Sequence, residues 1–216
     1  MGVVSTREEL VSLESLTHKL LALKISGRML VGIAGPPGVG KSTCAKSLEA
    51  GLNASVGCSA AVFPMDGYHY DDAILAERGL LGRKGAANTF DVAGFCHMLK
   101  RLRKNGEFEI AVPIFDRKLE LSRAGARIIP QSVDILIVEG NYLLLNQPPW
   151  CAVIQHLDAT IMLSASETTL HERLVERWKS YGIPEVEIPV RVEGNDFPNG
   201  RLVLSQSVAA DFIIAT

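Results

Sequence analysis

Apolar residues occur along the chain in short runs that alternate with amphipathic stretches. The runs Met29–Ala34 and Val133–Glu139 have the continuity of parallel strands that helices cover on both faces. Three shorter strands are predicted at Ala60–Met65, Leu157–Leu163 and Ala210–Ala215. Because strands and helices alternate, the pattern predicts one α/β domain, residues 1–216, with a three-layer, doubly wound, mostly parallel sheet.

The amphipathic stretches predict the helices that cover this sheet. Within residues 1–28 leucines recur at helical spacing from Leu10 to Leu23, and Ser5 or Thr6 is the expected cap of this N-terminal helix. Phe108–Phe115 contains a proline and predicts a sheet edge or a side hairpin, with Ala126–Ile129 as the candidate return strand. The other predicted helices are Asp71–Gly79, Val92–Lys104 with Asp91 as its cap, Glu167–Tyr181 and Pro184–Glu193.

The first strand leads directly into Gly35-x-x-x-x-Gly40-Lys41-Ser42, the pattern of a phosphate-binding loop, and a helix is predicted after it. Glycines let the backbone bend so that successive N–H groups face a phosphate, and the helix N-terminus adds free donors. Lys41 can reach the β- and γ-phosphates, and Ser42 can bind Mg²⁺. A chance Gly-rich turn is the alternative, but strand, loop and helix occur in the required order. We therefore predict a nucleotide site that contains Gly35, Gly38, Val39, Gly40, Lys41, Ser42 and Thr43.

Two carboxylates follow other predicted strands. Asp66 comes directly after Ala60–Met65, and Glu139 ends the strand Val133–Glu139. In open α/β sheets ligands bind at the carboxyl ends of the strands, so both side chains are expected near the phosphate loop. Phosphoryl transfer needs charge neutralisation and a group that accepts the hydroxyl proton. One carboxylate can hold Mg²⁺ while the other is the base; a helix cap for Asp66 and a salt bridge for Glu139 are the alternatives.

Two arginines, Arg173 and Arg177, lie four residues apart on one predicted helix. Like charges at this spacing destabilise a helix by roughly 0.2–0.5 kcal/mol unless an anion lies between them. A nucleotide phosphate could supply that anion if the helix belongs to a lid that closes over the reaction. A solvated face, with Glu172 and Glu176 as partners, explains the spacing equally well.

Other polar residues leave two interpretations open. His69 could contact the acceptor or a phosphate, or it could stack against Tyr68 and Tyr70. The basic clusters Arg83–Lys84 and Asp116–Lys118 are solvated loops by default, with binding of an anionic substrate as the alternative.

Composition narrows the class of protein further. The chain of 216 residues has a net charge of −2, so neither nucleic acid nor an anionic membrane is expected as a partner. Met1–Leu10 is charged and predicts no signal peptide. The four cysteines lack CxxC or zinc spacing and are expected to be reduced, mostly buried thiols of a cytoplasmic protein: Cys44, Cys58, Cys96 and Cys151.

Taken in order, these motifs resemble the P-loop kinases of the uridine kinase, phosphoribulokinase and bacterial pantothenate kinase group. The resemblance runs from about Leu30 to Ile214 and includes Met65–His69, Val112–Arg117, Ile137–Tyr142 and Asn195–Gly200. It implies a P-loop NTPase fold with a small lid at 167–200, and ATP and Mg²⁺ as cofactors. It also implies Asp66 as the catalytic base, Ser42 and Glu139 at the metal, and Lys41, Arg173 and Arg177 as further catalytic residues. Asn195, Asp196 and Asn199 would form a nucleotide-side loop, for which ordinary turn residues are the alternative.

The resemblance leaves the acceptor open. Uridine kinases carry an Asp-His-Pro-Asp type of segment where this chain has Lys84–Asp91, whereas Glu77–Leu81 is more similar to pantothenate kinases. The chain as a whole is similar to small members named fructokinase or sugar-transport-associated kinase. We expect ATP-dependent phosphorylation of a hydroxyl on a small metabolite such as fructose, with Tyr68, His69, Lys84 and Arg117 as candidate substrate contacts. A pantothenate or nucleoside kinase and a nucleotide switch without an acceptor are the alternatives, and a homodimer is a candidate assembly.

Overall fold

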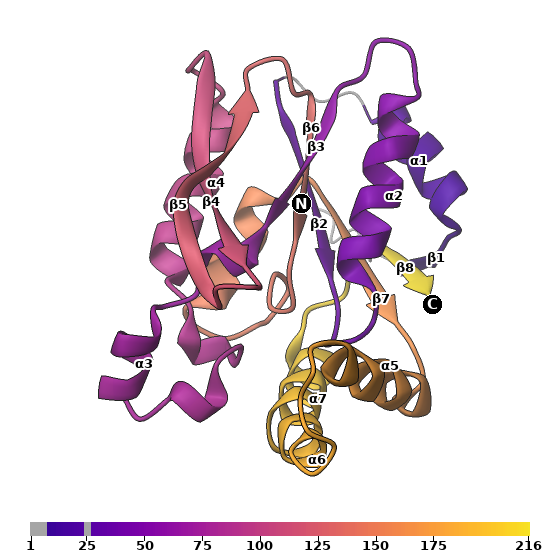
Figure 1. Ribbon diagram of the computed structural model, residues 1–216. Helices are drawn as coiled ribbons and strands as arrows, with labels where there is room; N and C mark the ends of the chain where they lie inside the picture. The colour runs from indigo at the N-terminus through magenta and orange to yellow at the C-terminus, as the bar shows by residue number, and fades with distance from the viewer. Residues whose placement is uncertain (1–7, 24–26) are drawn as a thin grey trace.

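A six-stranded sheet forms the centre of the protein in a computed structural model that describes residues 8–23 and 27–216 (Figure 1). Its strand order is β1-β8-β7-β2-β6-β3, and every neighbouring pair is parallel. The strands are β1 (Glu9–Leu10), β2 (Met29–Ala34), β3 (Ala60–Pro64), β6 (Ile135–Glu139), β7 (Ala159–Ser164) and β8 (Phe212–Ala215). The predicted doubly wound α/β sheet is confirmed.

Helices cover both faces of this sheet, as Figure 1 shows. Helices α1 (Leu13–Ala22) and α2 (Lys41–Asn53) cover one face, and α4 (Val92–Lys104) covers the other. Successive strand residues point to opposite faces, so Val31 and Ile33 pack toward α2 while Leu30 and Ala34 pack toward α4. All of β2 is therefore buried. Because β2 lies between β7 and β6 in the strand order, its carboxyl end is near the middle of the sheet edge.

A separate antiparallel hairpin stands beside the sheet. It consists of β4 (Glu109–Asp116) and β5 (Leu121–Pro130), and its register shifts between Val112 and Ile114, where Pro113 lacks an N–H to donate. Arg127 of β5 donates to the Val62 carbonyl oxygen of β3 at 2.6 Å, which joins the hairpin to the sheet. The side-hairpin prediction is confirmed, and the return strand is longer than Ala126–Ile129.

The predicted start of the N-terminal helix is wrong. Leu10 lies in β1, where it pairs with Ile213 of β8, and α1 begins only after Ser12, whose Oγ accepts from the Ser15 N–H at 3.2 Å. Leu10 is accordingly 71% exposed. Strand pairing at the sheet edge overrides the leucine spacing here. The predicted caps Ser5 and Thr6 lie outside the described residues.

Three helices, which we call the lid helices, lie together beyond the carboxyl ends of the central strands (Figure 1). They are α5 (Glu167–Ser180), α6 (Ile188–Arg191) and α7 (Phe197–Gln206), and a π-helical turn, Val192–Asp196, joins α6 to α7. Pro189 and Pro198 occupy first-turn positions of α6 and α7, where a missing N–H is tolerated. The predicted loop for Asn195, Asp196 and Asn199 is therefore wrong, because all three are helical.

The remaining elements are short. Helix α3 (Asp72–Glu77) is capped by Asp71, and 3-10 turns occur at Met65–Tyr68, Leu81–Arg83, Ala87–Thr89, Trp150–Ala152 and Ile154–His156. The four cysteines are free, and each is half-buried, less enclosed than expected. In the part of the chain that the structure describes, no helix has the length and apolar character needed to cross a membrane.

Candidate active site

The phosphate-binding loop lies between β2 and α2, as the sequence predicts. Gly38 and Gly40 adopt positive φ angles of 80° and 93°, a conformation that favours glycine, and Gly40 is the residue that precedes α2. The Lys41 ammonium is buried and donates to the Pro36 carbonyl oxygen at 2.9 Å, within the loop itself. Burial lowers the pKa of Lys41 to about 8, although Glu139 and Asp66 oppose the shift.

The two carboxylates lie beside this loop because β3 and β6 are neighbours. Pro64 of β3 pairs with Glu139 of β6, and Asp66 follows in the 3-10 turn Met65–Tyr68. Ser42 donates its hydroxyl to Glu139 Oε1 at 3.1 Å. Burial and the nearby Asp66 carboxylate raise the pKa of Glu139, whereas Lys41 lowers it. Asp66 caps no helix; its carboxylate forms an ion pair with Arg117.

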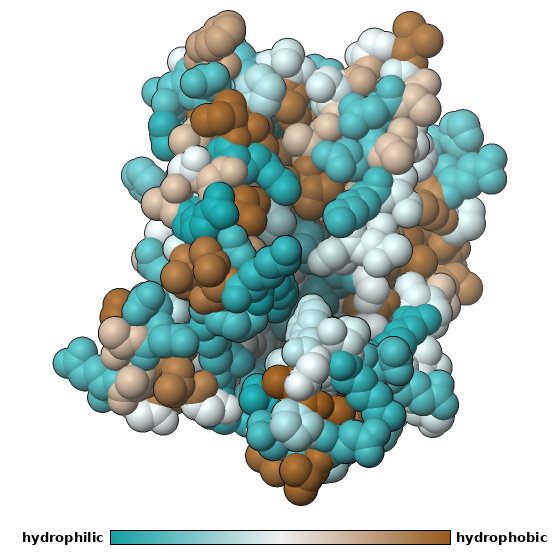
Figure 2. Space-filling model, viewed as in Figure 1, coloured by the Kyte–Doolittle hydropathy of each residue, from teal (hydrophilic) through white to brown (hydrophobic). Residues whose placement is uncertain are grey.

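These groups face one cavity of about 1340 Å³, which we call the active-site cavity. Figure 2 shows hydrophilic surface around the hollow between the hairpin side and the lid helices. The predicted site residues that line it are Gly38, Gly40, Lys41, Ser42, Thr43, Asp66, His69, Lys84, Arg117, Glu139, Arg173, Arg177, Asn195, Asp196 and Asn199. Gly35, Val39 and Tyr68 are not among the lining residues.

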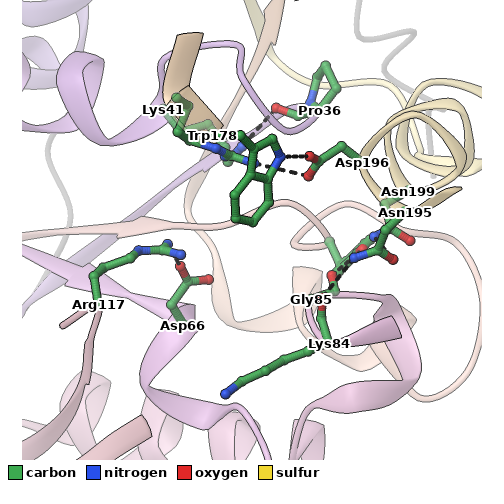
Figure 3. A network of polar contacts seen from close by, with 12 residues as sticks. Pro36, Lys41, Asp66, Lys84, Gly85, Arg117, Trp178, Asn195, Asp196 and Asn199 are labelled. Carbon is green, nitrogen blue, oxygen red and sulfur yellow. Dashed lines mark hydrogen bonds and ion pairs between the residues drawn. The ribbon is translucent and has the colours of Figure 1, made fainter. Parts of the chain in front are cut away.

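Both lid arginines have partners other than the predicted glutamates. Arg177 donates to Asp196 Oδ1 at 3.0 Å, and Trp178 Nε1 donates to Asp196 Oδ2 at 2.7 Å (Figure 3). Arg173 donates to Thr216 Oγ1 at 3.0 Å. The buried Asp196 thus holds Arg177 at the cavity wall, close enough to Lys41 to lower the pKa of its ammonium.

His69 lies in the part of the cavity wall that the turn Met65–Tyr68 and the hairpin residues Phe115 and Arg117 form, which we call the acceptor side. Its Nδ1 is 2.8 Å from the Asp66 carbonyl oxygen, so this nitrogen carries the hydrogen, and Nε2 of the neutral ring is an acceptor. Burial lowers the pKa of His69. The ring packs against Phe90 and Phe115, with centroid distances of 4.0 and 4.8 Å, and not against the neighbouring tyrosines.

Tyr68 points into the core instead of the cavity. Its ring packs against Phe63 and Phe95, with centroid distances of 6.1 and 5.1 Å. The structure therefore does not bring the predicted substrate contact at Tyr68 to the site.

Three hydrogen bonds that the sequence did not suggest join the lid helices to the segment Arg83–Lys84. Arg83 donates to the Gly194 carbonyl oxygen at 2.6 Å and to Asn199 Oδ1 at 3.2 Å. Asn195 donates to the Lys84 carbonyl oxygen at 2.9 Å (Figure 3). The partners are more than a hundred positions apart in the chain, so no local pattern could have paired them.

The fold and the site together define a class of protein. A phosphate-binding loop on a parallel sheet, two carboxylates at adjacent strand ends and arginines on lid helices surround one cavity. This arrangement is that of a P-loop phosphotransferase, in which alignment and charge neutralisation do most of the catalysis.

Comparisons with known proteins assign the chain within this class. No family model matches the chain. A candidate uridine kinase of Schizosaccharomyces pombe is 31% identical over 199 residues, which cover 89% of this chain and 85% of that relative. A pantothenate kinase of Enterococcus faecalis is 30% identical over 151 residues, 69% of this chain and 49% of its own. The crystal structure of a candidate fructose transport system kinase from Silicibacter sp. TM1040 superposes with a TM-score of 0.88 at 37% identity, covering 94% of this chain and 98% of that one.

The chain therefore belongs to the group of P-loop kinases that includes uridine kinases and bacterial pantothenate kinases. It is an ATP-dependent kinase.

Proposed function

We propose that the protein transfers the γ-phosphoryl group of ATP, with Mg²⁺, to a hydroxyl group of a small polar metabolite. The observation that supports this most is the position of Asp66 and Glu139 at the ends of neighbouring strands, beside the phosphate loop and on one cavity. A sugar such as fructose is the first compound to test, since the structural relative at 37% identity is named for fructose transport. Pantothenate and nucleosides follow, because sequence relatives are named for them.

In this proposal the acceptor hydroxyl oxygen forms a bond to the γ-phosphorus while the bond to the β,γ-bridging oxygen breaks. ADP leaves with that oxygen, and the hydroxyl proton passes to the Asp66 carboxylate. Lys41 and the N–H groups at the start of α2 bind the phosphates. Arg177 and Arg173, on the lid helix α5, compensate the charge that spreads over the transferring group.

Ser42 and Glu139 are suitable residues for the magnesium ion. Their side-chain oxygens lie 3.1 Å apart, and Mg²⁺ prefers oxygen ligands and is bound by one or two carboxylates together with substrate phosphates. When bound, the ion supplies positive charge to the phosphate oxygens. The ion would also add positive charge beside the buried Glu139 carboxylate, where Lys41 alone does not offset the rise in pKa that burial and Asp66 cause.

The test is a panel of hydroxyl metabolites incubated with ATP and read by a mass increase of one phosphoryl group. We expect at least one phosphorylated product, and we expect Asp66→Asn to lower kcat by about 10²-fold or more. ATP affinity, measured by calorimetry, should change little in this variant because the phosphate loop is intact. Glu107→Gln is the matched control, since Glu107 also pairs with an arginine but lies on the surface outside the cavity.

Two results would contradict the proposal in different ways. Wild-type turnover by Asp66→Asn would exclude Asp66 as the base. ATP binding without phosphorylation of any compound in a broad panel would favour a nucleotide-binding module without an acceptor.

A further inference from the structure

Arg117 brings a positive charge to the acceptor side of the active-site cavity. Within residues 8–23 and 27–216, Asp66 is the only carboxylate at ion-pair distance from its guanidinium group (Figure 3). The preceding residue, Asp116, is engaged elsewhere: it accepts two backbone N–H groups of the hairpin turn at 3.0 and 3.2 Å and an Arg123 N–H at 2.9 Å. The Asp116 carboxylate is thus occupied by its own turn, and Asp66 is the carboxylate that pairs with Arg117.

A second cation, from a different segment, lies at the same end of the cavity. The Lys84 ammonium lies 5.2 Å from the centroid of the Phe115 ring, and the Arg117 guanidinium carbon lies 5.3 Å from the same centroid. Lys84 is only 17% exposed and pairs with Asp72 at 2.6 Å. Phe115 and Arg117 belong to the hairpin, whereas Lys84 follows the turn Leu81–Arg83, so the fold places two cations from separate elements against one aromatic ring.

The proposed role of Asp66 creates a conflict with its present contact. To accept the proton of the acceptor, its carboxylate must turn to the hydroxyl group, and Arg117 then loses its counter-ion. Arg117 is 56% exposed, so water screens part of its charge, but a neutral acceptor still leaves its guanidinium group without a carboxylate partner in the cavity wall. An acceptor that carries its own anionic group replaces the lost partner.

We infer that the acceptor carries a carboxylate or phosphate group in addition to its reacting hydroxyl, and that Arg117 and Lys84 bind this anionic group. The inference rests on the proposed function, because it assigns Asp66 to the hydroxyl. Arg117 is then the residue that determines specificity: it pairs with Asp66 in the free enzyme and with the acceptor's anion in the complex. Guanidinium forms paired hydrogen bonds with either anion, so the structure accommodates both sources of charge.

The experiment compares matched acceptors that differ in charge. Fructose is tested against fructose 1-phosphate and fructose 6-phosphate, and glycerol against glycerate, and kcat/KM is measured for each with saturating ATP. We expect kcat/KM at least tenfold higher for the charged member of any pair that reacts. If the charged acceptor with the highest kcat/KM is a fructose phosphate, phosphate is the recognised group; if it is glycerate, carboxylate is.

The variant Arg117→Met should remove most of this preference, chiefly by raising KM for the charged acceptor about tenfold or more, while the KM for ATP changes little. Arg101→Met is the matched control. Arg101 also forms an arginine–carboxylate pair, with Glu107, but lies outside the cavity, and its replacement should leave the preference intact. A neutral acceptor used as well as its charged counterpart, or an unchanged preference in Arg117→Met, overturns the inference.

Direct binding separates this inference from the proposed function. Each compound is titrated into the complex with a non-hydrolysable ATP analogue. Tighter binding of the charged compounds that is lost in Arg117→Met supports the anion site even if no phosphoryl transfer occurs, in which case the proposed function alone fails. Equal binding of charged and neutral compounds, or binding of neither, overturns the anion site.

Discussion

Gly67 stands where the turn that carries Asp66 meets the hairpin that carries Arg117. A Cβ atom added at Gly67 would lie 2.6 Å from the Pro113 carbonyl oxygen, 2.8 Å from its carbonyl carbon and 3.2 Å from the Ile114 nitrogen. Real Cβ atoms essentially never approach closer than 3.0 Å, and all three neighbours are backbone atoms that no rotamer change can move. Gly67→Ala must therefore push the turn and the hairpin apart.

The contact at 2.6 Å has to lengthen by at least 0.4 Å to reach that 3.0 Å limit. Overpacking of a well-packed interior costs about 1–3 kcal/mol, which for a domain of this size lowers Tm by several degrees. Catalysis is more sensitive, because a displacement of about 1 Å at a reacting group can cost ~10²-fold. We expect kcat to fall roughly tenfold or more, while ATP affinity stays within about twofold, since the shift leaves the phosphate loop in place.

The assay combines thermal unfolding, ATP calorimetry and acceptor kinetics on the purified variant. Gly106→Ala is the control: a Cβ there meets nothing closer than 3.7 Å, and its backbone φ is not in the left-handed region. Full activity and an unchanged Tm in Gly67→Ala would refute the close approach of turn and hairpin. A loss of ATP affinity as large as the loss of kcat would show that the displacement reaches the phosphate loop as well as the acceptor side.

Two further predictions concern the nucleotide side. A lysine is charged below its pKa, and the pKa of Lys41 is about 8, so ATP affinity measured by calorimetry should fall about tenfold between pH 7 and pH 9. The variant Lys41→Met should not show this fall. A constant affinity of the wild-type protein up to pH 9 would contradict the prediction. Asp196→Asn leaves the partly buried donors of Arg177 and Trp178 with one oxygen acceptor in place of two, so urea unfolding should show about 1 kcal/mol or more of lost stability and turnover should fall. Wild-type stability in that variant would mean that the network contributes little.

Local signals predicted the elements that depend on neighbouring residues. The run Met29–Ala34, the glycines after it and the start of α2 are contiguous, so strand, loop and helix could be predicted from one stretch. Glu139 ends one strand and Asp66 comes just after another, and parallel strands share their carboxyl edge, which brought both to the loop. The cap of α4 by Asp91 was equally local, with the Gly94 N–H at 2.9 Å from its carboxylate.

Predictions failed where distant segments decide between local alternatives. Leucine spacing favoured one long N-terminal helix, but pairing with β8, some two hundred residues away, draws Leu10 into a strand. Asn195, Asp196 and Asn199 looked like turn residues, but packing of α5, α6 and α7 over the cavity keeps the chain helical through them. The partners of Arg83, Arg117 and Arg177 could not be inferred for the same reason.

The sequence by itself determined which loop has the form of a phosphate-binding loop and that two carboxylates stand near it, because glycine conformation and hydrophobic period are properties of contiguous residues. Only the tertiary structure decided that Arg117 neutralises Asp66, that Asp196 holds Arg177, and that Tyr68 turns away from the cavity. Those contacts join residues that only the packing of the whole sheet and its helices brings together. The pair of Arg117 and Asp66 is the contact from which the charge of the acceptor can be tested.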